Sequence, residues 1–355
     1  MKKKFNSKMI IKIVIADILI LAASLLTFAY FDHVRGWGNA EPMDEIKPPS
    51  FDLSEGSLFN PSEDSTSKAP DLSSKEDDVS LDMPDNSEAS EEPSSESTIP
   101  DGVYTDGEVI STETVYKSKY VSVELKKIYF ENTLYMVEDI YVKHIESLAA
   151  GFAKGLNPLS GEKTPIYDMV EYYRNNGYNV VAAINGDYFN RKGATIRNGV
   201  LYGDGIAQFE VCVLYKDGTM VTMPAGEFDA QTELSKGAWH VWDFGPSLLD
   251  KNGEALTDFS FRRDISGPNP RTAIGYYEPG HYCFVVAGGR GEKAYGVSLA
   301  ALARFMESMD FNVAYNLDGG KSSIMVYGDE IVNAEYQDTT RNNTDMVFIQ
   351  DFPAS

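Results

Sequence analysis

The stretch Val180-Val181-Ala182-Ala183-Ile184-Asn185-Gly186-Asp187 decides how the folded part of this chain is expected to be organised. Five apolar residues in a row are typical of a strand that is buried on both faces. The next residues place an amide, Asn185, and a carboxylate, Asp187, at the end of that strand. Two residues apart, they point to the same side if the extended conformation continues. An Asn-Gly dipeptide also suits an ordinary turn, so the pair alone leaves both interpretations open.

More strands are expected on both sides of this stretch. Residues 120–129 and 135–142 alternate between apolar and polar side chains with many β-branched and aromatic residues, which predicts half-buried antiparallel strands. Residues 284–287 form another continuous apolar run. Asp217-Gly218 and Asn252-Gly253 are hairpin signals. Strands are therefore expected to predominate.

Two helices are expected among these strands. Thr164 is a suitable N-cap with Pro165 in the first helical position, and Gly177 ends this helix. Ser298 caps the second helix, after which residues 313–315 return as a strand. Apolar side chains at helical spacing form the buried faces, which are Met169, Val170 and Tyr173 in the first helix and Leu299, Leu302, Ala303 and Met306 in the second. We expect an α+β fold, a single mixed-sheet domain with strands predominating and flanking helices.

A transmembrane helix and a disordered stalk are expected to precede this domain. Residues 13–31 form an apolar run of 19 residues, long enough to cross a hydrocarbon core of roughly 30 Å, and lysines before it place the N-terminus in the cytoplasm. A cleaved signal peptide is the alternative, but the run is longer than a usual signal sequence. Residues 41–101 hold 18 acidic residues against three lysines, which predicts disorder. The expected divisions are a cytoplasmic tail (1–8), a transmembrane signal anchor (9–31), an acidic Ser/Pro-rich linker (32–101) and a folded domain (102–355).

Composition excludes several classes of function. Of the net charge of −23, the linker accounts for 3 − 18 = −15, so the acidity says little about the folded domain, and neither part resembles a nucleic-acid binder. Cys212 and Cys283 lie in apolar runs and are expected to be buried thiols, although a disulfide remains open. No histidine has the spacing of a zinc helix or follows a nucleophile-elbow pattern, the four being His33, His144, His240 and His281. Zinc and serine hydrolases therefore lose support.

A second amide and carboxylate pair follows the strand at residues 313–315. It opens the segment Asn316-Leu317-Asp318-Gly319-Gly320-Lys321-Ser322-Ser323, whose glycines and serines would let backbone N–H groups and hydroxyls approach an anion. The segment is not a P-loop, because Tyr315 stands where that motif needs glycine. Two such pairs suit sugar hydroxyls, and two carboxylates could act as acid and base in glycoside cleavage. They would equally suit Ca²⁺ or Mg²⁺.

Taken together, five ordered segments resemble the phosphodiester glycosidase family, the uncovering-enzyme-like N-acetylglucosamine-1-phosphodiester alpha-N-acetylglucosaminidase domains. The segments that carry the resemblance are 183–189, 244–249, 271–275, Arg290 with 297–299, and 316–326. Asp187 and Lys321 stand where the family has glycine, and 287–290 lacks an aspartate often found in the family. These departures concern the substrate more than the fold.

The resemblance implies hydrolysis of the bond between a sugar anomeric carbon and a phosphodiester oxygen. Asp318 would then be the catalytic carboxylate, and Asp187 could be a second one. Asn185 and Asn316 would orient sugar hydroxyls. The other substrate-binding residues, mainly those that would hold the phosphate, are Arg271, Thr272, Arg290, Gly319, Gly320, Ser322 and Ser323. No cofactor is certain, and Ca²⁺ or Mg²⁺ could bind.

The anchor and the linker indicate a single-pass protein of the cell membrane with an extracellular catalytic domain. We expect a sugar phosphodiester, an envelope glycopolymer or an exopolysaccharide as substrate, contact with the membrane through the N-terminal helix, and no nucleic acid. Two other functions remain open at this point. The chain could be a non-catalytic module that binds envelope polysaccharide, or a metal-dependent phosphoesterase that breaks the P–O bond.

Overall fold

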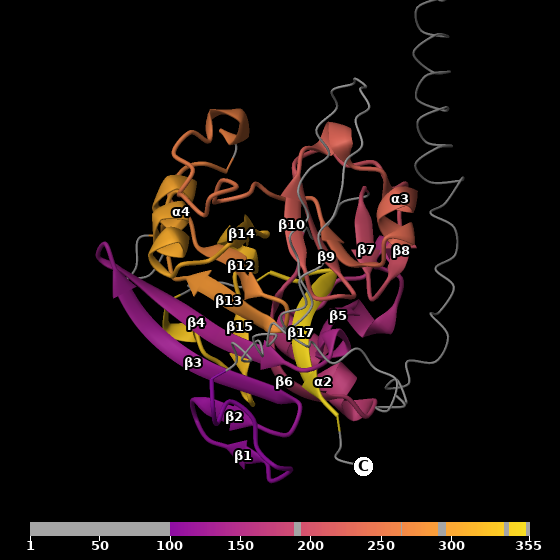
Figure 1. The fold of residues 1–355 in the computed structure, drawn as a ribbon, viewed down its shortest axis with the longest axis vertical. Helices are drawn as coiled ribbons and strands as arrows, with labels where there is room; N and C mark the ends of the chain where they lie inside the picture. The colour runs from indigo at the N-terminus through magenta and orange to yellow at the C-terminus, as the bar shows by residue number, and fades with distance from the viewer. Residues whose placement is uncertain (1–99, 188–192, 264, 290–295, 337–340, 353–355) are drawn as a thin grey trace, which may run out of the picture.

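The computed structural model describes residues 100–187, 193–263, 265–289, 296–336 and 341–352. These residues form three β-sheets with three α-helices and several short 3-10 helices (Figure 1). All the strand pairs described are antiparallel. The expected single domain in which strands predominate is confirmed. The sheet we expected to be mixed is three antiparallel sheets.

In each sheet, neighbouring strands pair in the following order. The seven-stranded sheet contains β1 (Ile110–Ser111), β2 (Val115–Lys117), β3 (Val121–Phe130), β4 (Thr133–Val142), β13 (His281–Ala287), β12 (Arg271–Glu278) and β14 (Val313–Asn316). The second sheet contains β10 (Met220–Met223), β9 (Val211–Tyr215), β11 (Ala238–Trp242), β7 (Thr195–Arg197) and β8 (Val200–Tyr202). The third sheet contains β16 (Glu330–Ile331), β15 (Met325–Tyr327), β6 (Asn179–Asn185), β17 (Asp345–Asp351) and β5 (Leu148–Phe152).

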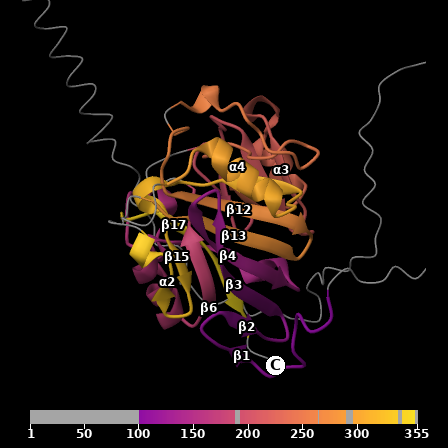
Figure 2. The ribbon, with the colours of Figure 1, turned by 90° about the vertical axis from the view of Figure 1, so that its left-hand side faces the viewer.

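The helices are short. The α-helices are α2 (Ile166–Asn175), α3 (Ala230–Ser235) and α4 (Leu299–Ser308). The 3-10 helices are η2 (Ile145–Ser147), η3 (Ala153–Gly155), η4 (Pro158–Ser160), η5 (Ala225–Glu227), η6 (Ser260–Arg262), η7 (Gly320–Ser322) and η8 (Ala334–Tyr336). Figures 1 and 2 show α2 and α4 lying against different sheets.

One hydrophobic core lies between the three sheets. It contains side chains from each sheet, such as Phe284 of β13, Trp242 of β11 and Ile184 of β6. Smaller cores form where a helix covers the outer face of a sheet. Helix α4 packs on the outer face of the seven-stranded sheet, and α2 packs on the outer face of the third sheet. A strand that has the central core on one face and a smaller core on the other reads as a continuous apolar run.

The stretch that opened the sequence analysis forms β6, as predicted. Val181 and Ile184 point into the central core, whereas Val180 and Ala183 point toward α2. Both faces of β6 are therefore covered, which favours apolar residues at every position. In α+β proteins this pattern does not require a parallel sheet, because helices and sheets can cover an antiparallel strand from both sides.

For α2, the first predicted helix, the predicted buried face is confirmed and the predicted N-cap is wrong. Met169 and Val170 are buried as expected. Thr164, however, forms a backbone bridge with Asn343, in which each N–H donates to the other's carbonyl oxygen at 3.0 and 2.8 Å. Pro165 is the N-cap residue and makes no side-chain cap. Because Thr164 pairs with Asn343, Pro165 takes the N-cap position that was expected for Thr164.

The other predicted elements are found close to their expected positions. The side-chain oxygen of Ser298 accepts a hydrogen bond from Ala301 N at 3.1 Å and caps α4 as predicted. Asp217-Gly218 lies in the turn between β9 and β10. Cys212 and Cys283 are both free, buried thiols, as expected, and burial raises their pKa well above the ordinary value.

The predicted tail, anchor and nearly all of the predicted linker lie outside the described residues. The same holds for Arg290. Within the part of the chain that the structure describes, no helix has both the length and the apolar character needed to span a membrane.

Candidate functional site

The two amide and carboxylate pairs predicted from the sequence meet where the seven-stranded sheet and the third sheet adjoin. Asn185, the last residue of β6, donates through Nδ2 to the backbone oxygen of Asp318 at 2.7 Å. Its Oδ1 accepts from Thr272 Oγ1 at 2.7 Å, and Thr272 belongs to β12. All three side chains are buried. Asn185 therefore joins the two sheets at the point where both predicted motifs begin.

Asp318 is the carboxylate at the centre of this junction. Its Oδ1 accepts from the Gly319 N–H at 2.9 Å, and its Oδ2 accepts from the Ser322 hydroxyl at 2.5 Å. The residue is 6% exposed. Burial raises the pKa of Asp318 to about 6, although the Ser322 hydroxyl and the charge of Arg341 act in the opposite direction. The result is an oriented carboxylate whose pKa lies close to neutral pH.

The glycines after Asp318 are needed for close packing. A Cβ at Gly319 would lie 2.8 Å from the backbone oxygen of Pro270, and Gly320 has a φ of 63°. The Gly320 N–H donates to that same oxygen at 2.8 Å. We predicted that these backbone N–H groups would approach an anion. Both are directed inward instead, since the Gly319 N–H donates to Asp318.

Two buried oxygens close to Asp318 in the chain have no hydrogen-bond partner among the described residues. They are Oδ1 of Asn316 and Oγ of Ser323. The amide nitrogen of Asn316 is already engaged, since it donates to the backbone oxygen of Gly245 at 2.8 Å. Leaving a buried polar group unpaired costs about 1–3 kcal/mol. Both oxygens therefore need a partner, which ligand hydroxyl groups can provide.

Asp187 follows β6 of the third sheet and faces the second sheet. Its two carboxylate oxygens accept from the backbone N–H groups of Asp243 and Phe244, at 2.9 and 2.8 Å. Burial, followed by the negative charge of Asp243, raises the pKa of Asp187 to about 7, and the charge of Arg197 acts against this. Both oxygens are thus occupied in holding the segment that follows β11.

A buried ion pair between Arg197 and Asp345 lies beside Asp187. Arg197 of β7 donates through Nε to Asp345 Oδ2 at 3.0 Å, and its Nη2 lies 3.8 Å from Asp187 Oδ2. The side chain of Arg197 is 1% exposed. The Gly186 N–H donates to Asp345 O at 3.1 Å, and a Cβ at Gly186 would overlap the Asp345 carboxyl group. The ion pair therefore requires glycine between Asn185 and Asp187.

Arg271, which was predicted to hold a phosphate, makes several hydrogen bonds to the protein backbone. Its Nε donates to Val297 O at 3.0 Å, and its Nη2 donates to the backbone oxygens of Ile265 and Gly267. Burial, with a smaller effect from Arg262, lowers the pKa of Arg271 to about 10. In the described structure its guanidinium joins two loops beside the site.

These geometries can be compared with known proteins. A curated relative, the SPbeta prophage-derived uncharacterized protein YomE of Bacillus subtilis (strain 168), is 28% identical over 191 residues, which cover 50% of this chain and 29% of that protein. This chain thus matches less than a third of its relative's length. Residues 178–350 match the phosphodiester glycosidase family. The resemblance carried by the five sequence segments is confirmed for this part of the chain.

A solved structure has a fold similar to that of this chain. It is the catalytic domain of zebrafish N-acetylglucosamine-1-phosphodiester alpha-N-acetylglucosaminidase, auto-inhibited by its pro-peptide. The match has a TM-score of 0.51 at 18% identity and covers 65% of this chain and 83% of that one. At this identity the likeness concerns the fold.

Most of the residues predicted for the site lie near one another. Asn185, Thr272 and Asp318 are linked by hydrogen bonds, and Ser322 joins Asp318 directly. Asp187 follows Asn185 but faces the second sheet, where its described hydrogen bonds lie. The roles assigned to these residues remain predictions.

Three charged residues of the segment that matches the family were not predicted from the sequence. Arg197 and Asp345 stand in short or apolar strands, without a motif that marks them as buried. Arg341 Nη1 lies 4.0 Å from Asp318 Oδ2 although the two residues belong to separate segments. Across the described residues, no group of three or more His, Cys, Asp or Glu side chains is arranged to hold a metal ion.

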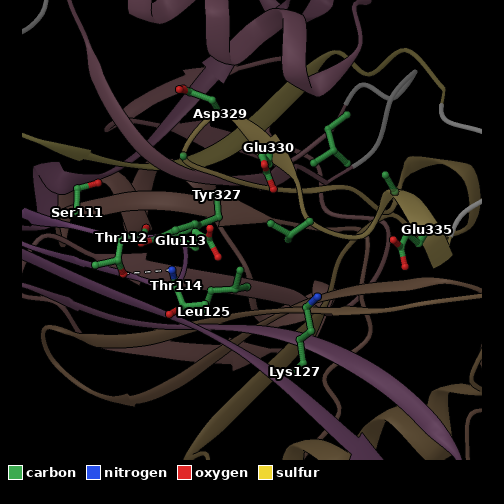
Figure 3. Close-up of a pocket in the computed structure, with 14 residues that line it drawn as sticks. Ser111, Thr112, Glu113, Thr114, Leu125, Lys127, Tyr327, Asp329, Glu330 and Glu335 are labelled. Carbon is green, nitrogen blue, oxygen red and sulfur yellow. Dashed lines mark hydrogen bonds between the residues drawn. The ribbon is translucent and has the colours of Figure 1, made fainter.

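A groove of about 560 Å³ lies outside the predicted site (Figure 3). It is lined by residues of β1, of the turn that follows β1, of β3 and of the segment from β15 to η8, and its acidic side chains include Glu113, Glu330 and Glu335. The Tyr327 hydroxyl donates to Thr112 O at 3.3 Å and connects its two walls. None of the predicted site residues lines this groove.

Proposed function

We propose that this protein hydrolyses the bond between a sugar anomeric carbon and a phosphodiester oxygen, with Asp318 as the catalytic carboxylate. The observation that carries the proposal is the environment of Asp318. Two donors hold its oxygens in place, and burial brings its pKa to about 6. A general base is most effective when its pKa lies near the working pH. The match of residues 178–350 to the phosphodiester glycosidase family supports glycosidase-type activity.

In the proposed reaction, Asp318 takes one proton from a water molecule. The water oxygen forms a bond to the anomeric carbon as the bond from that carbon to the phosphodiester oxygen breaks. The electron pair of the broken bond stays on the phosphate, so a phosphomonoester and the free sugar are released. A phosphate is a weak base and a good leaving group, so no strong general acid is needed. Asp318 then returns its proton to solvent.

The neighbouring polar groups would position the sugar. Asn316 Oδ1 and Ser323 Oγ are buried and without a described partner, and each can bind a sugar hydroxyl. Asn185 acts indirectly, because its amide fixes the backbone of Asp318. For Asp187 we propose a positioning role, since backbone N–H groups occupy both of its oxygens.

The natural substrate and location are proposed from the N-terminal sequence. An apolar run at residues 13–31 with lysines before it supports a membrane anchor, and the acidic stretch 41–101 supports an extended linker. The folded domain would then act outside the membrane on a phosphodiester of an envelope glycopolymer or glycoconjugate.

The test is hydrolysis by the purified full-length protein in ¹⁸O-labelled water. N-acetylglucosamine 1-phosphodiesters are the first substrates to try, followed by other sugar 1-phosphodiesters, each with and without a chelator. Label in the released sugar supports C–O cleavage. Label in the phosphate would overturn the proposal in favour of a phosphoesterase, and binding without turnover would favour a polysaccharide-binding module.

Asp318→Asn provides the residue-level test. The amide cannot take a proton from water, so kcat should fall by about 100-fold or more. Asp329→Asn is the matched control, because it removes a carboxylate whose side chain is 90% exposed. Near-normal turnover by Asp318→Asn would refute the assignment.

A further inference from the structure

The phosphate of the proposed substrate needs a cationic partner. Negative charge accumulates on the phosphate oxygens as the C–O bond breaks, and preorganised positive charge at that position favours the reaction. Arg271 was the expected cation, but its Nε and Nη2 donate to three backbone oxygens. A guanidinium engaged in this way stabilises the loops around it.

Arg341 is placed where such a cation would be required. Its Nη1 lies 4.0 Å from Asp318 Oδ2, which is close enough for strong attraction but beyond hydrogen-bond length. The Arg341 side chain is 32% exposed, against 9% for that of Asp318. The cation is therefore the more solvent-exposed partner of the two.

The backbone of Arg341 is fixed on both sides. Its N–H donates to Lys321 O at 3.0 Å, in the turn that follows Asp318. Its carbonyl oxygen accepts from Asn343 Nδ2 at 3.1 Å. These contacts hold the start of the side chain against the 320–322 turn, while the guanidinium remains partly exposed. A planar guanidinium fork carried on a fixed backbone suits recognition of a phosphate oxygen pair.

We propose that Arg341 holds the phosphate group of the substrate beside Asp318. The inference rests on the proposed function for its substrate class, and it assigns the phosphate subsite to a residue that the sequence motifs do not include. A water molecule bound to Asp318 can attack only a sugar whose anomeric carbon lies close to that residue. The phosphate attached to this carbon would then lie next to the Arg341 guanidinium. The same positive charge favours the ionised form of Asp318, so one residue serves both the base and the leaving group.

The experiment measures binding of inorganic phosphate to the full-length protein by calorimetry. Arg341→Gln should weaken phosphate binding about tenfold or more, as expected for a charge-assisted hydrogen bond. Arg341→Lys should weaken it less, because the ammonium keeps the charge and loses the fork. Lys321→Gln is the matched control in the same turn, with an exposed side chain, and should change binding by less than about twofold. Thermal unfolding of each variant verifies that it is folded.

Two results would overturn the inference. One is phosphate binding by Arg341→Gln that equals binding by the unchanged protein. The other is an equal loss in Lys321→Gln, which would mean diffuse attraction to a basic surface. Failure of the proposed function has a different signature, because no sugar phosphodiester would then be cleaved at C–O while phosphate binding would still depend on Arg341.

Discussion

The hydrogen bond from Ser322 to Asp318 offers a way to change the protonation of the proposed catalytic carboxylate without removing it. In Ser322→Ala the donor at 2.5 Å from Asp318 Oδ2 is lost, and with it an interaction that favours the charged form. The pKa of Asp318, raised to about 6 by burial, should therefore rise further. Because a general base acts in its ionised form, activity should be lost on the acid side and recovered at higher pH.

The magnitude follows from the strength of such a bond. A hydrogen bond to a charged group contributes about 1.5–3 kcal/mol, and 1.36 kcal/mol corresponds to a change of one in pKa. The pKa of Asp318 should then rise by about 1 to 2 in Ser322→Ala. At about pH 7 the ionised fraction would fall from roughly 90% to between roughly 10% and 50%. Near about pH 9 most of the activity should return.

The assay is kcat/KM against pH for the unchanged protein, Ser322→Ala and Ser323→Ala. Ser323 Oγ has no described hydrogen bond, so its removal should raise KM and leave the acid limb of the profile in place. An acid limb near pH 6 in Ser322→Ala would refute the reasoning. A loss of activity that is the same at every pH would refute it equally, because it would mean that Ser322 acts on something other than protonation.

Three further predictions concern the groups that support the site. Arg197→Ala should lower the free energy of unfolding by about 3–5 kcal/mol in urea titrations, because Asp345 would stay buried without its counter-charge, whereas the exposed cation of Arg304 should be replaceable by alanine with little effect. Gly186→Ala should lower both the melting temperature and kcat, since its methyl group would overlap the Asp345 carboxyl. Burial raises the pKa of Glu138 well above its usual range, so the folded protein binds more protons than the unfolded chain and loses stability as pH rises from the ordinary carboxyl pKa toward the raised one. Glu138→Met should therefore be stabilising, more at about pH 8 than at about pH 5, and equal effects at both values would contradict the burial argument.

Local patterns were sufficient to predict the elements that deliver the site. Strand β6 is apolar at successive positions because both of its faces are covered, and the polar pair follows because the strand ends at the junction of two sheets. The same reasoning holds for β14, which leads into Asn316 and Asp318. Ser298 caps α4 through a contact with a residue three positions away. Interactions of this kind can be predicted because both partners lie close together in the sequence.

Interactions between distant segments could not be predicted in this way. Arg197 and Asp345 are 148 positions apart, and each alone reads as a charged surface residue of a strand. The backbone acceptors of Arg271, which are Ile265, Gly267 and Val297, lie outside its own strand, and no local pattern predicts that their oxygens face its guanidinium. Burial and pairing of charges depend on the completed fold, so the supporting groups of a site are harder to predict than its motif.

Strand β17 enters the third sheet between β5 and β6, although it follows both in the chain by more than 150 residues. Its first residue, Asp345, holds Arg197, and its backbone oxygen fixes Gly186 beside the candidate site. Long-range pairing of this kind forms only when the last partner is available. A growing chain therefore carries the first polar motif, at the end of β6, well before β17 is available to pair with that strand. The candidate site can be assembled only after β17 has been synthesised, so it forms together with completion of the fold.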